Sequence, residues 1–300
     1  MKCLNEILKN NPAVQALMKQ KGSLGNLTLT QEALLYSILY EEKKEPLLIV
    51  KGNNYTAQKL AEQLQALVDE KVLVLSMEDS LRVEAIASSP ESKARQLEVM
   101  NEMLNNQAKI IITHAGAMLK YLPSPELFKK VSKRIKVDDE LLMNELKEHL
   151  YIAGYEHVSR VDQPLCYAYR GGIVDVFSIN HDYPIRIEFF DTIVDSIRYF
   201  DPLTQKTIRK LDEVEIIPAT DLLFDDAMLD EIDHQVAKVL EKAKVQLVDE
   251  IKEELIATIN EDIESLYAHR KENHLYRYMT YLKKNASIFD YFDGDRKSVV

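Results

Sequence analysis

Hydrophobic and polar positions alternate most clearly over residues 169–200. Three runs of β-branched and aromatic residues are separated there by short polar turns, which predicts an antiparallel meander. Side chains point alternately to the two faces of a strand. The middle run thus has an apolar face and a mixed face: Ile185, Ile187 and Phe189 against Arg186, Glu188 and Phe190. The first is a core face, whereas a phenylalanine on a charged face implies that something covers it.

The first third of the chain predicts a parallel sheet. Continuous apolar runs that alternate with helical segments are typical of parallel strands covered on both faces. The predicted strands are 46–50, 72–75 and 109–113, and the predicted helices between them are 53–68 and 90–105. Two further helices are predicted over 1–20 and 31–40. These patterns predict an α/β architecture.

Prolines divide the chain into three predicted segments, 1–125, 126–218 and 219–300. In the second segment we expect a strand over 131–137, then a helix over 138–153 with acidic residues in its first turn. Gly154 would end this helix in a left-handed conformation. A last strand is predicted over 213–217. Together with the meander, these elements predict an α+β domain.

The third segment predicts one long amphipathic helix over 225–263, because apolar residues recur there at spacings of three or four. Aromatic residues interspersed with lysine and arginine follow over 270–292, a composition that could stack single-stranded nucleic acid or dock onto the first domain. Docking is the favoured interpretation because the chain is acidic overall. Ser298-Val299-Val300 reads as the start of another strand, so we expect a piece of a longer protein.

The net charge of the chain disfavours some classes of function. The chain has 300 residues, 38 basic and 49 acidic, and a net charge of −11. An acidic total disfavours a nucleic-acid clamp, which needs a basic footprint. No apolar run approaches the ~20 residues of a membrane span, and the N-terminus lacks a signal peptide. The two cysteines, Cys3 and Cys166, fit no metal-ligand spacing and predict reduced thiols in a cytoplasmic protein.

The segment 21–30 contains glycine and precedes a predicted helix, which is where a nucleotide-binding loop would lie. A phosphate-binding loop of the Walker type needs a lysine followed by serine or threonine. Here Gly25 is followed by Asn26, Leu27 and Thr28, and no acid pair for a metal ion follows any predicted strand. The favoured interpretation is a turn and a capped helix. We therefore expect no enzymatic activity, no catalytic residue, no cofactor and no metal.

The mixed face of the middle strand is the candidate site. Arginine and aromatic side chains are typical of interface hot spots. Arg186 and Phe190 share this face, and Arg170 lies in the preceding strand, with Glu188 and Arg198 as supporting residues. A structural alternative stays open. Phe190 could pack under the turn 191–193, and Arg186 could pair with Glu188 or Asp175.

The same stretch resembles the bacterial transcription-repair coupling factors (the Mfd family), in their N-terminal module related to the excinuclease subunit UvrB. The matching text lies in 170–177 (Arg-Gly-Gly-Ile-Val-Asp-Val-Phe), 184–191 (Pro-Ile-Arg-Ile-Glu-Phe-Phe-Asp) and 195–201 (Asp-Ser-Ile-Arg-Tyr-Phe-Asp). The match is dense over 169–219 and looser on both sides. It implies a degenerate helicase-like (RecA-like) α/β domain in two sequence segments, without a nucleotide-binding loop. An α+β domain would be inserted between them.

This resemblance also implies a function. The inserted domain of the family binds UvrA, the damage-recognition subunit of nucleotide excision repair, through residues that match Arg170, Arg186 and Phe190. The expected function is therefore a non-catalytic module that recruits a repair protein. RNA polymerase and DNA would be bound by domains beyond residue 300. The alternatives are a UvrB-like nucleotide-dependent DNA-unwinding enzyme and a DNA-binding module.

Overall fold

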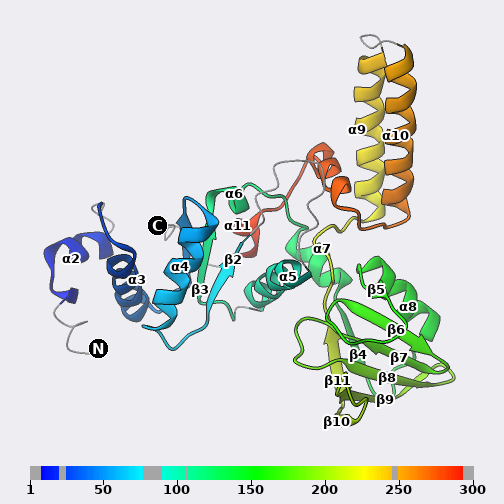
Figure 1. Ribbon diagram of the computed structural model, residues 1–300, viewed down its shortest axis with the longest axis horizontal. Helices are drawn as coiled ribbons and strands as arrows, with labels where there is room; N and C mark the ends of the chain where they lie inside the picture. The colour runs from blue at the N-terminus through cyan, green and yellow to red at the C-terminus, as the bar shows by residue number, and fades with distance from the viewer. Residues whose placement is uncertain (1–7, 20–24, 77–89, 106, 245–248, 293–300) are drawn as a thin grey trace. The chain divides into compact units, whose positions relative to one another are not determined.

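The computed structural model describes residues 8–19, 25–76, 90–105, 107–244 and 249–292 (Figure 1). It divides into two compact units, the first formed by 1–79, 102–120 and 292–300 and the second by 80–101 and 121–291. The three-segment division expected from the prolines stays a prediction. Cys3 and the strand expected at 298–300 lie outside the described residues.

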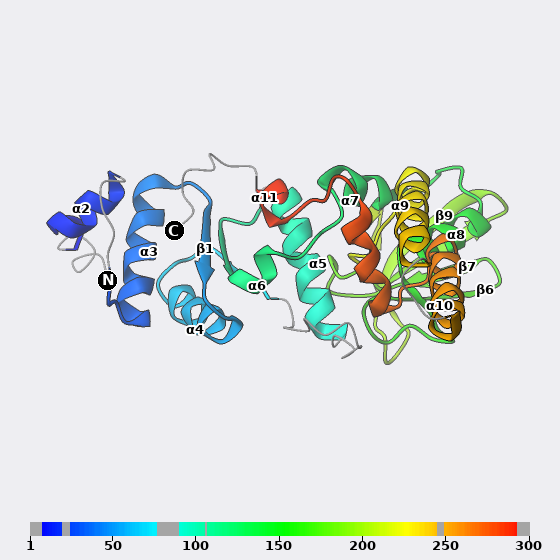
Figure 2. The same ribbon diagram turned by 90° about the horizontal axis from the view of Figure 1, so that it is seen from above.

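The first unit contains a three-stranded sheet in the order β1-β3-β2, and both pairings are parallel as predicted. The strands are β1 (Leu47–Lys51), β2 (Val72–Leu75) and β3 (Ile110–His114). The helices are α2 (Pro12–Met18), α3 (Leu29–Lys43), α4 (Asn54–Gln65) and α6 (Ala115–Met118) (Figure 2). Helix α4 packs on the sheet and α3 packs on α4. Leu60 and Leu64 of α4 are fully buried together with Ile110 and Ile112 of β3, which makes this interface the core.

The second unit contains a six-stranded sheet in the order β10-β9-β8-β7-β6-β5. Its strands are β5 (Glu156–His157), β6 (Cys166–Arg170), β7 (Ile173–Val176), β8 (Ile185–Phe190), β9 (Ile193–Phe200) and β10 (Thr207–Leu211). All neighbours from β6 to β10 pair antiparallel, so the predicted meander is confirmed. A separate ribbon pairs β4 (Lys133–Lys136) with β11 (Glu213–Ile216).

One hydrophobic core joins these elements. The apolar face of the sheet, helix α8 (Met143–Ile152) and the ribbon contribute fully buried side chains, among them Leu146, Leu150, Val174, Ile185 and Ile187. Helix α7 (Pro125–Val131) precedes β4, and α5 (Pro90–Leu104) begins in the second unit and ends in the first. The alternation predicted for β8 thus has its physical cause in this core.

The predicted start of the helix at Asp138 is wrong. Asp138 has a φ of +70°, and its N–H donates to Val194 O at 2.9 Å. Leu141 N donates to Thr192 O at 2.8 Å, so the segment 138–141 pairs with residues 192–194 at the start of β9, and α8 begins only at Met143. The predicted end is confirmed, because Gly154 has a φ of +90°.

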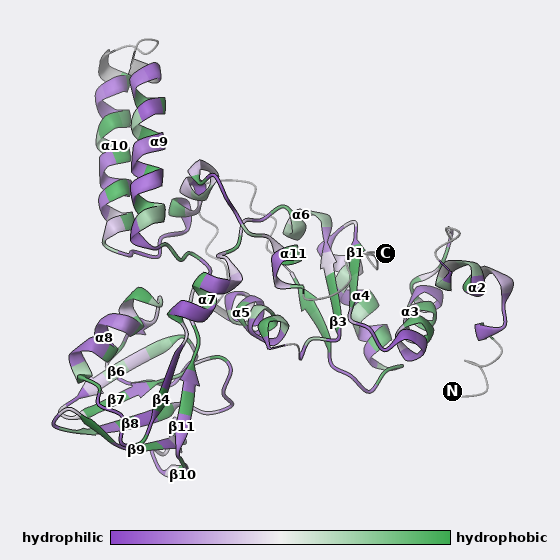
Figure 3. Cartoon of the chain, turned by 180° about the vertical axis from the view of Figure 1, so that it is seen from behind, coloured by the Kyte–Doolittle hydropathy of each residue, from purple (hydrophilic) through white to green (hydrophobic). Residues whose placement is uncertain are grey.

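The single long helix expected over 225–263 is also wrong. Apart from Leu247, which lies outside the described residues, its apolar residues belong to two helices, α9 (Asp226–Lys244) and α10 (Asp249–Tyr267), which lie side by side (Figure 1). Tyr267 Oη donates to Asp230 Oδ1 at 3.0 Å, so the end of α10 meets the start of α9 and the two run antiparallel. Figure 3 shows hydrophobic and hydrophilic positions alternating along both helices.

The aromatic segment packs inside the second unit. It forms the 3₁₀ helix η1 (Asn273–Tyr281) and the short α11 (Ile288–Tyr291). Tyr278 is buried against α9, and the hydroxyls of Tyr276 and Tyr291 donate to the carbonyls of Tyr121 and Pro123, both at 2.7 Å. The expected docking was onto the first domain, whereas the buried rings pack against α9 and residues 121–123 within the second unit. None of the described helices combines the length and the apolar character that crossing a membrane requires.

Candidate partner-binding surface

Strand β8 presents the two faces that its sequence predicts. Ile185 and Ile187 are fully buried, and Phe189 packs against the same core. Arg186 and Glu188 are half-buried on the opposite face. Phe190, the last residue of the strand, leaves 77% of its surface exposed. We call this opposite side of the six-stranded sheet, formed by residues such as Asp175, Arg186, Glu188, Phe190 and Arg198, the outer face.

Arg186 is held within the outer face by two strands and a loop. Its Nε and Nη2 donate to the two carboxylate oxygens of Asp175 on β7, each at 2.7 Å. Nη2 also donates to Gln205 Oε1 at 2.8 Å, and the guanidinium lies 4.4 Å from the ring centre of Phe200. The carboxylate of Asp175 raises the pKa of Arg186. The Arg186 side chain thus connects β8 to β7 and to the loop that contains Gln205, and little of its surface is left for a partner.

Glu188 is held in a similar way by Arg198 of β9. The two side chains form a two-point ion pair, with the shorter contact at 2.5 Å, and Ser196 donates to Glu188 at 2.7 Å. Hydrogen bonding from Arg198 is the largest cause that lowers the pKa of Glu188 to about 2. Both predicted supporting residues are therefore engaged with each other.

One end of the outer face is closed by a second, smaller core. Val161, Ala168 and Phe200 are buried together, and Phe177 packs against them. Arg160, next to Val161 in the segment that covers this end, donates to the carbonyls of Pro202 and Leu203 at 2.5 and 2.8 Å. These hydrogen bonds hold the segment in place. Within the described residues, this small core covers the end of the outer face that contains Ala168 and Phe200.

The open end carries Arg170, Phe190 and Ile193. Phe190 and Ile193 lie directly opposite one another across the β8–β9 turn, and Ile193 is 44% exposed. Arg170 is exposed at the end of β6, and its side chain makes no ion pair or hydrogen bond within the part of the chain that the structure describes. An unpaired cation and two exposed apolar side chains thus share the same end of the sheet.

Tight turns fix this end of the sheet. Arg170 pairs with Ile173 across the two residues Gly171 and Gly172, and Gly171 has a φ of +60°, which glycine adopts without strain. A Cβ at Gly172 would lie 2.9 Å from Phe189 O, so this turn runs close beside the end of β8. Phe189 N also donates to Gly172 O at 2.8 Å.

The structure thus divides the predicted site residues. Arg170 and Phe190 are exposed, whereas Arg186, Glu188 and Arg198 are engaged in ion pairs. Of the structural alternative, the pairing of Arg186 with Asp175 is found, but Phe190 does not pack under its turn. Ile193 was missed by sequence reasoning. Its signal was the two-residue turn 191–192, which places it opposite Phe190.

The segment considered for nucleotide binding ends in an ordinary helix cap. Thr28 caps α3 through its side chain, which accepts from Gln31 N, and the Gln31 side chain accepts in return from Thr28 N at 2.9 Å. This is a capping box, as the favoured interpretation of a capped helix predicts. Cys166 is a free, buried thiol, and no cluster of three potential metal ligands occurs among the described residues.

Comparisons with known proteins agree with this geometry. The family model described as the UvrB interaction domain matches residues 134–222. The chain is 32% identical over 274 residues to the transcription-repair-coupling factor of Bacillus subtilis, covering 89% of this chain and 23% of the relative. It is 25% identical over 303 residues to that of Staphylococcus aureus strain RF122, covering 98% of this chain and 26% of the relative.

The chain thus spans about a quarter of the length of these relatives. The matched domain contains the whole meander and both of its tight turns. These similarities identify the chain as the UvrB-homology module of the transcription-repair coupling factor family.

Proposed function

We propose that the six-stranded sheet recruits UvrA through the open end of its outer face. The observation that carries this proposal is Phe190, an aromatic side chain 77% exposed on a face where the neighbouring charges are paired. Apolar and arginine side chains without internal partners are typical hot spots of protein interfaces. The similarity to the UvrB interaction domain supports this choice of surface.

The contact residues in this proposal are Arg170, Phe190 and Ile193. Arg170 would bind a carboxylate of UvrA, because a guanidinium can donate two parallel hydrogen bonds to a carboxylate. Phe190 and Ile193 would insert together into an apolar depression of the partner. Arg186 would support binding indirectly. Its ion pair with Asp175 keeps β7 and β8 in register beneath the contact residues.

The test is a titration of purified UvrA against this chain and its variants. Arg170→Ala and Phe190→Ala should each weaken binding by about 2 kcal/mol or more. Both replaced side chains are exposed, so the circular dichroism and the melting temperature should stay unchanged. Unchanged UvrA affinity in the double variant would refute this surface.

For the first unit we propose a degenerate helicase-like scaffold without nucleotide hydrolysis. The parallel order β1-β3-β2 and the lysine-free helix start at Thr28 support this. A titration with magnesium and ATP tests it, because saturable binding would favour the alternative, a UvrB-like enzyme. In the complete protein, we propose that RNA polymerase and DNA are engaged by other domains.

A further inference from the structure

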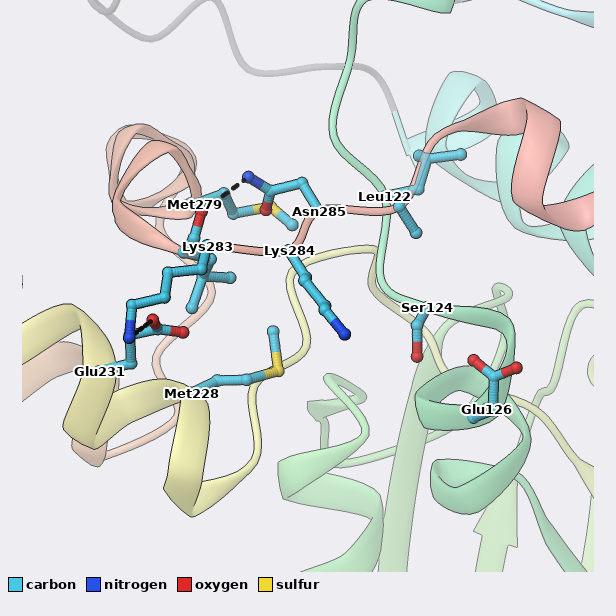
Figure 4. Close-up of a pocket in the computed structure, with 11 residues that line it drawn as sticks. Leu122, Ser124, Glu126, Met228, Glu231, Met279, Lys283, Lys284 and Asn285 are labelled. Atoms are coloured by element: carbon cyan, nitrogen blue, oxygen red, sulfur yellow. Dashed lines mark hydrogen bonds and ion pairs between the residues drawn. The ribbon is translucent and has the colours of Figure 1, made fainter.

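A cavity between residues 122–126, the start of α9 and the end of η1 is lined in part by side chains that are already buried or paired (Figure 4). Met279 and Leu282 are only 1% and 6% exposed. Lys283 points to Glu231 and lies 3.1 Å from it, so these two charges offset each other. These side chains select no particular ligand, whereas the edge of the six-stranded sheet at β6 does.

Strand β6 is paired on its β5 side only at its first two residues. Val158 N donates to Tyr167 O at 2.9 Å, so the backbone groups of Tyr167 point toward β5. Backbone groups along a strand point to its two sides in turn, so the N–H and C=O of Tyr169 point to that same side. Because β5 ends at His157, neither of these two groups has a hydrogen-bond partner among the described residues. We call this backbone position the free edge of β6.

The free edge exists because the chain crosses to the outer face directly after β5. Arg160 donates to the carbonyls of residues 202 and 203, and Val161 is buried with Phe200. The residues after 158 therefore do not continue β5 alongside Tyr169. The edge is open as a result of these contacts and is a fixed property of the fold.

Different side chains flank the free edge on its two faces. The ring of Tyr169 is 44% exposed and stacks on His157, with the ring centres 4.8 Å apart. Lys147 Nζ lies 4.3 Å from the centre of the Tyr169 ring. On the other face of the strand, Arg170 is exposed, and its side chain is unpaired within the described residues. A ligand at this edge thus meets an ordered aromatic ring on one side and a cation on the other.

The unpaired backbone groups select the class of ligand. A residue of an antiparallel strand exchanges two hydrogen bonds with the residue opposite, one from its own N–H and one to its own C=O. A phosphate backbone only accepts hydrogen bonds, so it would leave the C=O of Tyr169 unpaired. A second copy of the chain is disfavoured, because antiparallel pairing at Tyr169 would set two Tyr169–Lys147 pairs side by side and bring like charges together. An extended segment of a different protein satisfies both groups.

We propose that UvrA adds an extended segment, antiparallel to β6, at this free edge. The inference rests on the proposed recruitment of UvrA, because Arg170 belongs to both surfaces. The UvrA residue opposite Tyr169 exchanges two backbone hydrogen bonds with it and places an apolar side chain on the tyrosine ring. A flanking residue of the segment faces the other side, where its carboxylate binds Arg170. Strand addition of this kind is a recurring mode of peptide recognition at exposed sheet edges.

The first test is amide hydrogen exchange of this chain, free and bound to purified UvrA. The Tyr169 N–H is unpaired in the free chain and should exchange about tenfold more slowly, or slower still, in the complex. Ala168 pairs with Asp175 of β7, so its amide is the internal reference and should be protected in both states. An unchanged exchange rate at Tyr169 in a complex that forms would overturn the proposal.

Two replacements at residue 169 then separate the backbone from the ring. Tyr169→Ala removes the ring but keeps the N–H, whereas Tyr169→Pro also removes the N–H, which a strand edge tolerates. UvrA should bind the proline variant about fivefold more weakly than the alanine variant, the effect of one hydrogen bond. Tyr183→Ala is the matched control, because Tyr183 is 42% exposed and precedes β8 at the end away from Phe190, and it should bind as the wild type does.

Melting temperatures establish which variants are folded, and the exchange experiment decides alone if the proline variant is not. Equal affinities of folded alanine and proline variants would refute strand addition. If Arg170→Ala and Phe190→Ala still weaken binding in that case, the proposed recruitment surface stands without it. If none of these replacements changes the UvrA affinity, the proposed function itself is wrong.

Discussion

Arg186 and Arg198 lie directly opposite one another on β8 and β9, and each is bound by a different carboxylate. Like charges at facing positions of a sheet repel. Asp175 and Glu188 offset this repulsion, so the outer face is a set of coupled ion pairs rather than a row of free charges. Removing either acid would leave the two facing arginines with a single carboxylate as their ion-pair partner.

The first prediction concerns Asp175→Asn. Arg186 would lose its carboxylate while only 16% of its side chain is exposed, so the unfolding free energy should fall by about 1–3 kcal/mol. Urea unfolding followed by circular dichroism measures this change. Asp195→Asn, an exposed acid on β9 of the same sheet, is the matched control and should stay within about 0.5 kcal/mol of the wild type. Equal stability of the two variants would contradict the role given to the ion pair.

A second prediction separates binding from stability at Phe190. Because its ring is 77% exposed, Phe190→Ala should change stability by no more than about 0.5 kcal/mol. Its UvrA affinity should fall about thirtyfold. Leu203→Ala is a suitable control, since Leu203 is 82% exposed but belongs to the closed end of the sheet. A similar affinity loss from both variants would indicate a general effect of surface hydrophobicity.

The third prediction is a pH dependence carried by Glu188. Its pKa in the folded chain is about 2, below the ordinary value of 4.5. A lowered pKa stabilises the folded state above pH 4.5, and this contribution is lost as the pH falls from 4.5 towards 2. Solvent screening keeps the effect at about 1 kcal/mol.

The measurement compares wild type with Glu188→Gln. The difference between their unfolding free energies should be largest at neutral pH and should shrink as the pH falls towards 2. The variant thereby cancels the contributions of all other acids. A difference that stays constant over this pH range would argue against the Arg198 ion pair as the cause.

A fourth prediction concerns the turn beside Phe189. Gly172→Ala would place a methyl group 2.9 Å from a backbone carbonyl that cannot rotate away, so we expect a loss of about 1–3 kcal/mol in stability. At Gly52, nothing lies within 4 Å of an added Cβ, so Gly52→Ala should cost far less. Thermal unfolding of the two variants distinguishes a crowded turn from a general glycine effect.

The faces of β8 were predictable because one short-range rule decides them. Alternation with period two assigns Ile185 and Ile187 to the core regardless of what packs there. The closed end of the outer face was not predictable. It depends on Val161 meeting Phe200 and on Gln205 reaching Arg186, contacts made by loops that carry no periodic signal.

The two wrong helix predictions share a physical cause. Acidic residues at 138–140 match a helix start, but their backbone pairs with residues 192–194 instead, a choice made by tertiary contacts. The apolar spacing over 225–263 is correct for helices yet contains nothing that reveals a reversal of direction. Local periodicity therefore indicates which residues are helical, but not how many helices they form.

The narrow turns at Gly171-Gly172 and at residues 191–192 have a consequence for comparing lengths of related chains. At the open end of the sheet, the strands that carry Arg170 and Phe190 are connected by turns of only two residues. A single residue added within β8 would turn Phe190 to the opposite face. Spacing therefore encodes the surface as strictly as residue identity does. A relative with arginine and phenylalanine at matching positions but with one residue more inside β8 would present a different side chain on the outer face.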